Sequence, residues 1–140
     1  FQELVKFQRC IVPANSWFEW SETKKPYLIK NKENKIISFA GLFKIDENGE
    51  KKFIIITSEA NGSLRKIHNR TPVVVKQKNF INWLGEDYKS ALSILKPINN
   101  NDYDFHPVSP EIGKVSNDSK DILKVYQNKK NDIHLFPNLF

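Results

Sequence analysis

Short runs rich in β-branched and aromatic residues constrain the fold of this chain most. They lie at residues 11–13, 17–21, 27–29, 36–43 and 53–58. Turn-forming residues separate several of them, at 23–25, 32–34 and 46–49. Runs of this length bounded by turn residues are typical of strands joined by hairpins. The first half of the chain is therefore predicted to form an antiparallel sheet.

Helices are predicted before and after this region. Residues 1–7 place apolar side chains at a helical spacing, and this helix should end before Pro13. Further helical segments are predicted at residues 61–67, 77–84, 89–95 and 119–130. Ser119 should cap the last of these, with Asp118 and Asp121 near its positive end.

Two more strands, at residues 73–75 and 105–108, complete the expected elements. Residues 97–104 are predicted to form a loop, because Asn and Asp side chains compete for backbone hydrogen bonds. A chain of 140 residues has the size of one domain. We therefore expect one α+β domain over residues 1–140, in which a strongly bent antiparallel sheet or a small β-barrel is surrounded by helices.

The composition bounds the environment and the partners. No apolar run approaches the roughly eighteen residues of a membrane helix, and no signal peptide opens the chain. We expect a monomer in the cytoplasm, associated with the nucleoid if the source is bacterial. A formal net charge of +6 suits a nucleic-acid partner, but 19 of the 22 basic residues are lysines spread along the chain, which AT-rich coding also produces.

Glu19 is the first candidate for chemistry, because it lies among Trp17, Phe18 and Trp20. Desolvation by such neighbours raises a carboxyl pKa toward the range useful for proton transfer. Strand alternation places Glu19 on the face of Trp17 and opposite Trp20, so Glu19 and Trp20 can meet one ligand only at a strand end or bend. The alternative is a solvent-facing glutamate on a half-buried strand.

His68 is the second candidate, in the segment that ends in Pro72. An imidazole near its ordinary pKa both donates and accepts protons at neutral pH, as a general acid or base requires. The alternative is a histidine that only caps backbone groups in a turn. His106 and His134 lack chemical partners in the sequence, so neither a metal site nor a cofactor is expected.

Three further residues suit single-stranded nucleic acid. Trp20 offers a flat apolar surface for base stacking, and Arg70 a guanidinium that pairs with phosphate. Thr57, at the end of a strand, could add a hydroxyl contact. Trp17 and Trp83 are predicted to serve the core.

Several motifs occur together and in a characteristic order. They are residues 9–13, 17–20, 26–29, 40–42, 57–61, 67–70, 72–73, 83–84 and 107–109. In this set the chain resembles the SRAP family, the SOS-response-associated peptidase domains that process abasic sites in single-stranded DNA. The resemblance extends from about residue 1 to about residue 118. It implies that Glu19 and His68 are active-site residues and that Trp20 wedges against DNA bases.

The resemblance also implies a mechanism. Family members use an N-terminal cysteine, whose amine and thiol capture the ring-opened aldehyde of an abasic site as a thiazolidine. His68 would then assist ring opening, and Glu19 the imine steps. A self-processing peptidase (hydrolase) activity and lyase-like chemistry are implied as well, with single-stranded DNA containing abasic sites as the partner.

The sequence departs from the family pattern at the nucleophile. It begins at Phe1, contains no methionine and has no N-terminal cysteine, so we expect an N-terminally incomplete domain that is inactive as printed. Cys10 matches an ordinary cysteine of the family's first motif, and a structural role is predicted for it. Two other functions stay open: a non-covalent single-stranded DNA-binding module, which Glu19 disfavours, and a hydrolase that uses Glu19 and His68 on a small substrate.

Overall fold

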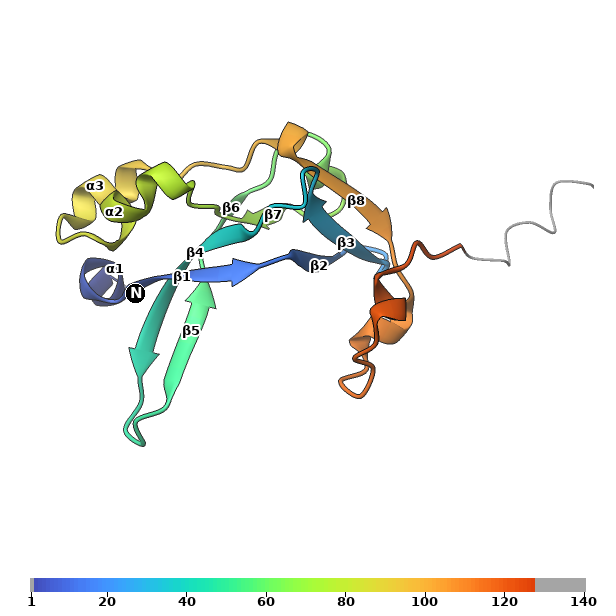
Figure 1. The fold of residues 1–140 in the computed structure, drawn as a ribbon, viewed down its shortest axis with the longest axis horizontal. Helices are drawn as coiled ribbons and strands as arrows, with labels where there is room; N and C mark the ends of the chain where they lie inside the picture. Colours follow the sequence, from blue (N-terminus) through green and yellow to red (C-terminus); the bar gives the residue numbers. More distant parts are fainter. Residues whose placement is uncertain (1, 128–140) are drawn as a thin grey trace, which may run out of the picture.

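Three antiparallel sheets form the frame of the molecule (Figure 1). The computed structural model describes residues 2–127. The first sheet has the strand order β1–β4–β5 and comprises β1 (Arg9–Ala14), β4 (Ile37–Ile45) and β5 (Lys51–Ile55). The second has the order β2–β3–β8 and comprises β2 (Ser16–Trp20), β3 (Pro26–Asn31) and β8 (Tyr103–Pro107). The third pairs β6 (Thr57–Glu59) with β7 (Arg70–Pro72).

The strands change sheet where the chain bends. β1 and β2 are separated by Asn15 alone, yet β1 pairs with β4 and β2 pairs with β3. The turn of the β2–β3 hairpin contains Lys24, and the turn that joins β3 to β4 contains Asn34, both in the left-handed region with φ of 61° and 54°. The expectation of antiparallel sheets in an α+β fold is confirmed. The expectation of a barrel is wrong, because the described strands divide into three sheets and close no ring.

Two apolar clusters make up the core. One contains Ile29, Phe39, Leu64 and Tyr103, with the Trp17 side chain packed against it. The other surrounds the fully buried Trp83. The core roles predicted for Trp17 and Trp83 are therefore confirmed.

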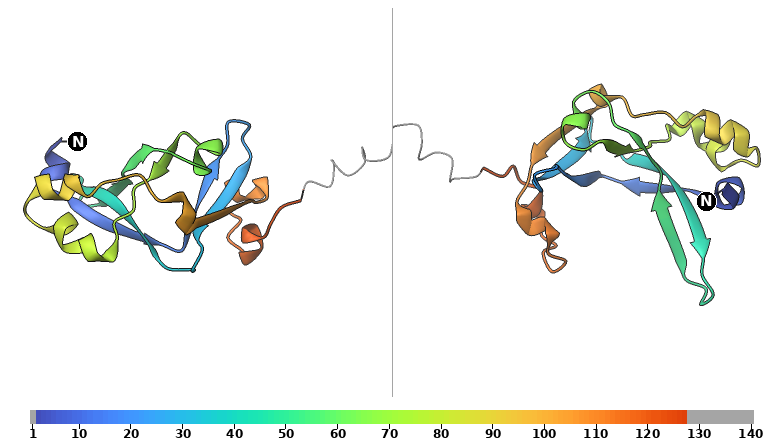
Figure 2. Two further views of the ribbon diagram at one scale, coloured as in Figure 1. Left: turned by 90° about the horizontal axis from the view of Figure 1, so that it is seen from above. Right: turned by 180° about the vertical axis from the view of Figure 1, so that it is seen from behind.

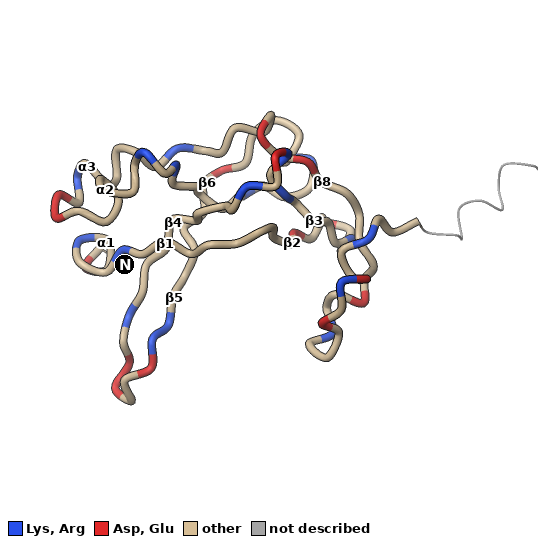
Figure 3. Tube along the Cα trace, in the orientation of Figure 1, with Lys and Arg blue, Asp and Glu red and all other residues tan. Residues whose placement is uncertain are grey.

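The short helices gather at one end of the molecule and do not surround the sheets (Figures 1 and 2). They are α1 (Gln2–Phe7), α2 (Phe80–Leu84) and α3 (Tyr88–Ser93). The β4–β5 hairpin, which is part of the first sheet, projects from the body of the molecule. Lys and Arg are spread along the whole trace, and this hairpin carries both signs of charge (Figure 3).

Arg9 joins the helical end to the first sheet. Its Nε donates to the carbonyl oxygen of Trp83 at 2.6 Å, and its Nη1 donates to that of Lys6 at 2.7 Å. The Trp83 Nε1 in turn donates to the Cys10 carbonyl oxygen at 2.7 Å. Cys10 is partly buried, and burial raises the pKa of its thiol, so the thiol is less reactive than that of a solvent-exposed cysteine. These contacts support the structural role predicted for Cys10.

Several elements differ from the sequence-based expectations. The run at residues 53–58 divides into β5 and β6, because Ile56 leaves β5: its N–H donates to Ala40 and its carbonyl accepts from Val73. A strand lies at Arg70–Pro72, whereas residues 73–75 contribute only a bridge from Val74 to Phe39. The expected 97–104 loop contains a 3₁₀ turn, Asn100–Asp102, and the start of β8.

The helix expected at residues 119–130 is wrong for the described residues. A 3₁₀ turn covers Lys120–Leu123, and Ser119 forms no side-chain cap. Lys124 is extended, and the Tyr126 N–H donates to the Pro107 carbonyl oxygen, so the chain follows the end of β8. Residues 128–130 of this expectation lie outside the described residues. The 3₁₀ turn at Leu64–Lys66 does confirm the helical turn expected at 61–67.

Among residues 2–127, no helix has the length and apolar character needed to cross a membrane.

Candidate active site

Glu19 lies on the inner face of β2, where it shares a side with Trp17. Trp17 packs edge-on against Phe39 and Tyr103 of the core, with ring centroids 5.6 and 5.5 Å apart. Alternation along the strand directs Glu19 to this same face. As a result, only 23% of its side chain is exposed.

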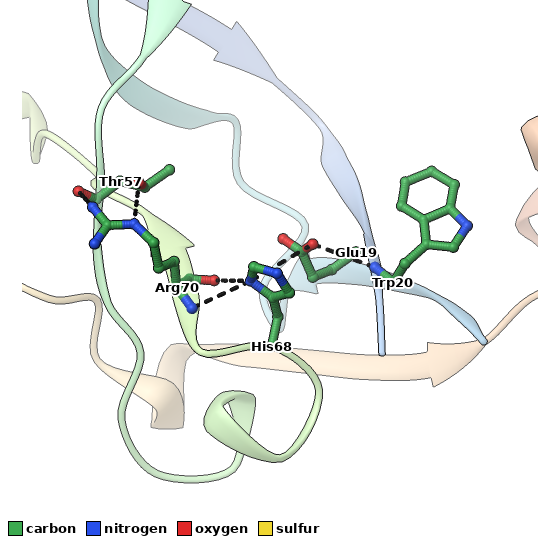
Figure 4. Close-up of polar contacts among 5 residues, drawn as sticks. All are labelled: Glu19, Trp20, Thr57, His68 and Arg70. Atoms are coloured by element: carbon green, nitrogen blue, oxygen red, sulfur yellow. Dashed lines mark hydrogen bonds and ion pairs between the residues drawn. The ribbon is translucent and has the colours of Figure 1, made fainter. Parts of the chain in front are cut away.

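His68 faces Glu19 from the loop before β7 (Figure 4). Its Nδ1 lies 4.0 Å from Glu19 Oε1. The same nitrogen lies 3.2 Å from the Arg70 N–H, which donates to it, and 3.1 Å from the Arg70 carbonyl oxygen. In the neutral ring that accepts from Arg70, Nε2 carries the proton; in the protonated ring, Nδ1 becomes a donor that faces the carbonyl and the carboxylate.

Burial raises the pKa of Glu19 above its ordinary value of 4.5. The charge of His68 and the backbone N–H of Trp20 both act in the opposite direction, and that N–H donates to Oε1 at 3.3 Å. Desolvation is the largest of these effects, so the pKa of the carboxyl is raised, and one imidazole lies beside it. A pair of this kind can pass a proton to or from a substrate bound against it.

Arg70 is held by Thr57 across the β6–β7 pair. Its Nε donates to Thr57 Oγ1 at 2.8 Å, and its Nη2 donates to the Thr57 carbonyl oxygen at 2.6 Å. Within residues 2–127, Nη1 forms no hydrogen bond, and Arg70 is exposed. The guanidinium is thus fixed on one edge and available on the other, which suits an anionic group.

Trp20 ends β2 next to this pair. It is 41% exposed, and its ring points away from Glu19 and His68 (Figure 4). Trp20 is the last residue of β2, so the strand end predicted from the sequence is present. The aromatic ring and the carboxylate therefore belong to adjacent residues. The structure thus brings Glu19 to His68 and Thr57 to Arg70, and it joins Trp20 to the first pair through the chain.

One contact was not predicted from the sequence. Thr57 was expected to offer its hydroxyl to a ligand, but the hydroxyl accepts from Arg70 instead. Only the register of the third sheet, in which Thr57 lies opposite Pro72 and Glu59 opposite Arg70, brings them together. No local sequence signal reveals that register.

The other two histidines of the chain are His106 and His134. His106 Nε2 lies 2.9 Å from the Leu123 carbonyl oxygen, which gives it a structural partner. His134 lies outside the described residues. Within the part of the chain that the structure describes, no cluster of three or more His, Cys, Asp or Glu side chains is arranged to hold a metal ion.

Comparison with known proteins places this chain in one family. The family model for the SOS response associated peptidase (SRAP) matches residues 1–115. The chain is 30% identical over 135 residues to abasic site processing protein YoqW of Bacillus subtilis, covering 89% of this chain and 60% of that protein. It is 27% identical over 134 residues to abasic site processing protein YedK of Escherichia coli, covering 89% and 60%.

A solved structure agrees with the sequence comparison. A crystal structure of a protein from Bacteroides thetaiotaomicron superposes with a TM-score of 0.79 at 29% identity, covering 91% of this chain and 60% of that one. The chain thus spans about 60% of the length of the relatives it matches. With the family model matching residues 1–115, the chain belongs to the SOS response associated peptidase (SRAP) family.

Proposed function

We propose that this chain carries the proton-transfer and DNA-binding residues of a domain that processes abasic sites in single-stranded DNA. The observation that carries the proposal is the partly buried Glu19 carboxyl, with its raised pKa, 4.0 Å from His68 Nδ1. Both residues stand in the motifs by which the chain resembles its family. The printed names of YoqW and YedK, abasic site processing proteins, support the same substrate.

The proposed chemistry is covalent capture of the lesion by an N-terminal cysteine. Its amine adds to the open-chain aldehyde, and the carbinolamine loses water to form an imine. The thiol sulfur then attacks the imine carbon, and the thiol proton ends on the nitrogen of the thiazolidine. Cys10 is not this nucleophile, because its nitrogen is part of a peptide bond within β1.

Each proton in this sequence needs a carrier. The ring of the sugar opens when a base removes the hemiacetal proton and an acid protonates the ring oxygen, and we assign this step to His68. Loss of water from the carbinolamine requires an acid, and closure of the thiazolidine requires a base. We assign both to Glu19, because burial raises the pKa of its carboxyl, so that the protonated form is easier to populate than in a solvated glutamate.

Binding of the strand is assigned to Trp20, Arg70 and Thr57. The exposed Trp20 ring suits a base stacked beside the lesion. The outer edge of the Arg70 guanidinium suits a phosphate, with Thr57 beside it. A self-processing peptidase step and lyase-like chemistry would use the same Glu19–His68 pair.

A non-covalent single-stranded DNA-binding module is the second candidate. The observations that favour it are the exposed ring of Trp20 and the guanidinium edge of Arg70 that is free of hydrogen bonds within residues 2–127. Trp20 and Arg70 would suffice for binding, whereas the partly buried Glu19 would be an unfavourable charge beside a phosphate. A hydrolase acting on a small substrate has less support, since no nucleophile contacts Glu19 or His68 among the described residues.

Incubation with a single-stranded oligonucleotide that contains one abasic site tests the proposal. The printed chain is compared with a version extended at its N-terminus by the matching segment of a relative that begins with cysteine, and adducts are resolved on a denaturing gel. A covalent band with the extended version alone is the expected result. If neither version forms a band but both bind the oligonucleotide, the binding module is the correct account.

A further inference from the structure

Two adjoining cavities form a groove on this molecule at some distance from Glu19 and His68. Their volumes are about 910 and 350 Å³, and they share four lining residues: Val74, Lys76, Asp102 and Tyr103. The walls come from the segment that joins β3 to β4, the segment after β7 and the segment before β8. We call this the lysine groove.

The lysine groove concentrates positive charge. Five lysines line it, namely Lys32, Lys35, Lys76, Lys78 and Lys96, against the carboxylates of Glu33 and Asp102. The excess of three positive charges compares with a formal net charge of +6 for the whole chain. Half of the net charge of the chain therefore lines one groove.

Three of these lysines have no carboxylate partner. Lys32 lies 3.8 Å from Asp104, and Lys35 pairs with Glu33. Lys76, Lys78 and Lys96 form no ion pair among residues 2–127, and all three are exposed. They are available to an anion.

Apolar residues also line the lysine groove. Val75 and Tyr103 are 3% and 8% exposed, and Phe80 adds a partly buried ring. Asn79 and Asn99 also line it. Because these apolar residues are buried or partly buried, the exposed lysines are what the groove offers a ligand, which suits a ligand that carries phosphates, as a single nucleic-acid strand does.

The chain itself limits the distance between this groove and the candidate active site. Lys76 follows Arg70 by six residues along an extended segment, in which Thr71, Val73 and Val75 are buried. A fully extended chain covers at most about 3.6 Å per residue, so the two backbones lie within roughly 22 Å. At about 3.4 Å per phosphate of a stacked strand, that span corresponds to roughly six nucleotides.

We propose that the lysine groove binds phosphates of the DNA strand that flanks the lesion, as a second contact region beyond Arg70. The proposal rests on the proposed function for the identity of the strand. Lys76, Lys78 and Lys96 would neutralise phosphates without reading sequence, and the groove would lengthen the stretch of strand that the domain holds.

The test measures binding of a fluorescent 20-nucleotide oligothymidylate by anisotropy at several salt concentrations. The groove variant is Lys76→Gln/Lys96→Gln. The matched control is Lys44→Gln/Lys51→Gln on the β4–β5 hairpin, which removes two exposed lysines that also lack ion pairs within the described residues. Trp20→Ala is measured in parallel as the variant of the proposed site.

The groove variant is expected to reduce the slope of log affinity against log salt by about 1.4, since each neutralised phosphate of a single strand contributes about 0.7. The control should leave the slope unchanged. An equal change in both variants, or in neither, overturns the proposal. If Trp20→Ala weakens binding while the groove variant does not, only the groove fails; the reverse pattern removes the proposed site and leaves the groove. Absence of binding by the unaltered chain overturns both.

Discussion

The Nδ1 of His68 lies 4.0 Å from Oε1 of Glu19, although Glu19 lies in β2 and His68 in the loop before β7. Glu19 reaches this position because β2 directs it to the same face as the core residue Trp17. His68 reaches it because the Leu64–Lys66 turn packs on the same apolar cluster. The same apolar cluster therefore positions both residues. Substitutions in the cluster and substitutions at the site can still be compared separately, by their effects on stability and on DNA binding.

Trp17 and Trp20 should behave differently when each is replaced by alanine. Trp17→Ala should cost about 3–5 kcal/mol of unfolding free energy, because the ring packs between Phe39 and Tyr103. Trp20→Ala should leave stability nearly unchanged and weaken single-stranded DNA binding by about 1–3 kcal/mol. Denaturant unfolding and fluorescence anisotropy measure the two quantities. Loss of stability in both variants would place Trp20 in the core and not in the binding surface.

Glu19 should make stability depend on pH in a defined direction. Burial raises its pKa above 4.5, so between pH 4.5 and that raised pKa the folded chain holds a proton that the unfolded chain has lost. The stabilisation that this proton gives the folded state is complete below about pH 4.5 and is lost as the pH rises through the raised pKa of Glu19. Glu19→Gln, which cannot ionise, should therefore be more stable than the unaltered chain at pH 7, with a smaller difference at pH 4.

Urea unfolding at both pH values measures this difference, with the exposed Glu47→Gln as the control. The control should show no gain at pH 7. A Glu19→Gln variant that is less stable than the unaltered chain at pH 7 would mean that attraction by His68 exceeds the cost of burial.

Thr57 should act on DNA binding through Arg70. Thr57→Val removes the hydroxyl that accepts from Arg70 Nε at 2.8 Å and should weaken binding by about 0.5–1.5 kcal/mol, while Thr57→Ser should retain it. In an Arg70→Ala background, Thr57→Val should have no further effect. If the valine variant still weakens binding in that background, the Thr57 hydroxyl contacts the DNA itself.

Gly41 tests the packing around Cys10. A Cβ at Gly41 would lie 2.8 Å from Cys10 Sγ, 3.1 Å from Val12 Cγ2 and 3.2 Å from the Ile54 carbonyl oxygen. Gly41→Ala should therefore destabilise the fold by about 1–3 kcal/mol. Adding Cys10→Ala should restore part of this loss in a thermal or urea unfolding experiment. A loss that Cys10→Ala leaves unchanged would assign the clash to Val12 and Ile54 alone.

The strands of the sequence could be predicted because their signals are local. Alternating apolar residues and turn residues marked β1 to β4, and apolar spacing marked α1 and α2. The break at Ile56 and the position of β7 could not be predicted, since both follow from hydrogen bonds to Ala40 and Val73 across the fold. The helix expected after Ser119 failed because tertiary hydrogen bonds to Pro107 and His106 hold that segment along β8.

The same distinction applies to the site. The sequence could suggest Glu19, Trp20, His68 and Arg70 as candidates by residue type and motif. The contacts of Glu19 with His68 and of Thr57 with Arg70 could not be predicted, because each of them joins distant parts of the chain. The lysine groove was equally hidden, since lysines from three segments appear in the sequence only as scattered charge.

Single-turnover kinetics of adduct formation test the central claim most directly. In the version extended to begin with cysteine, an oligonucleotide with one abasic site is held at saturating protein, and Glu19→Gln is compared with Glu47→Gln. Loss of a positioned proton carrier should slow adduct formation by about 10²- to 10⁴-fold, with the affinity for the oligonucleotide changed little. Equal rates for the two variants would contradict the assignment of Glu19 as the proton carrier.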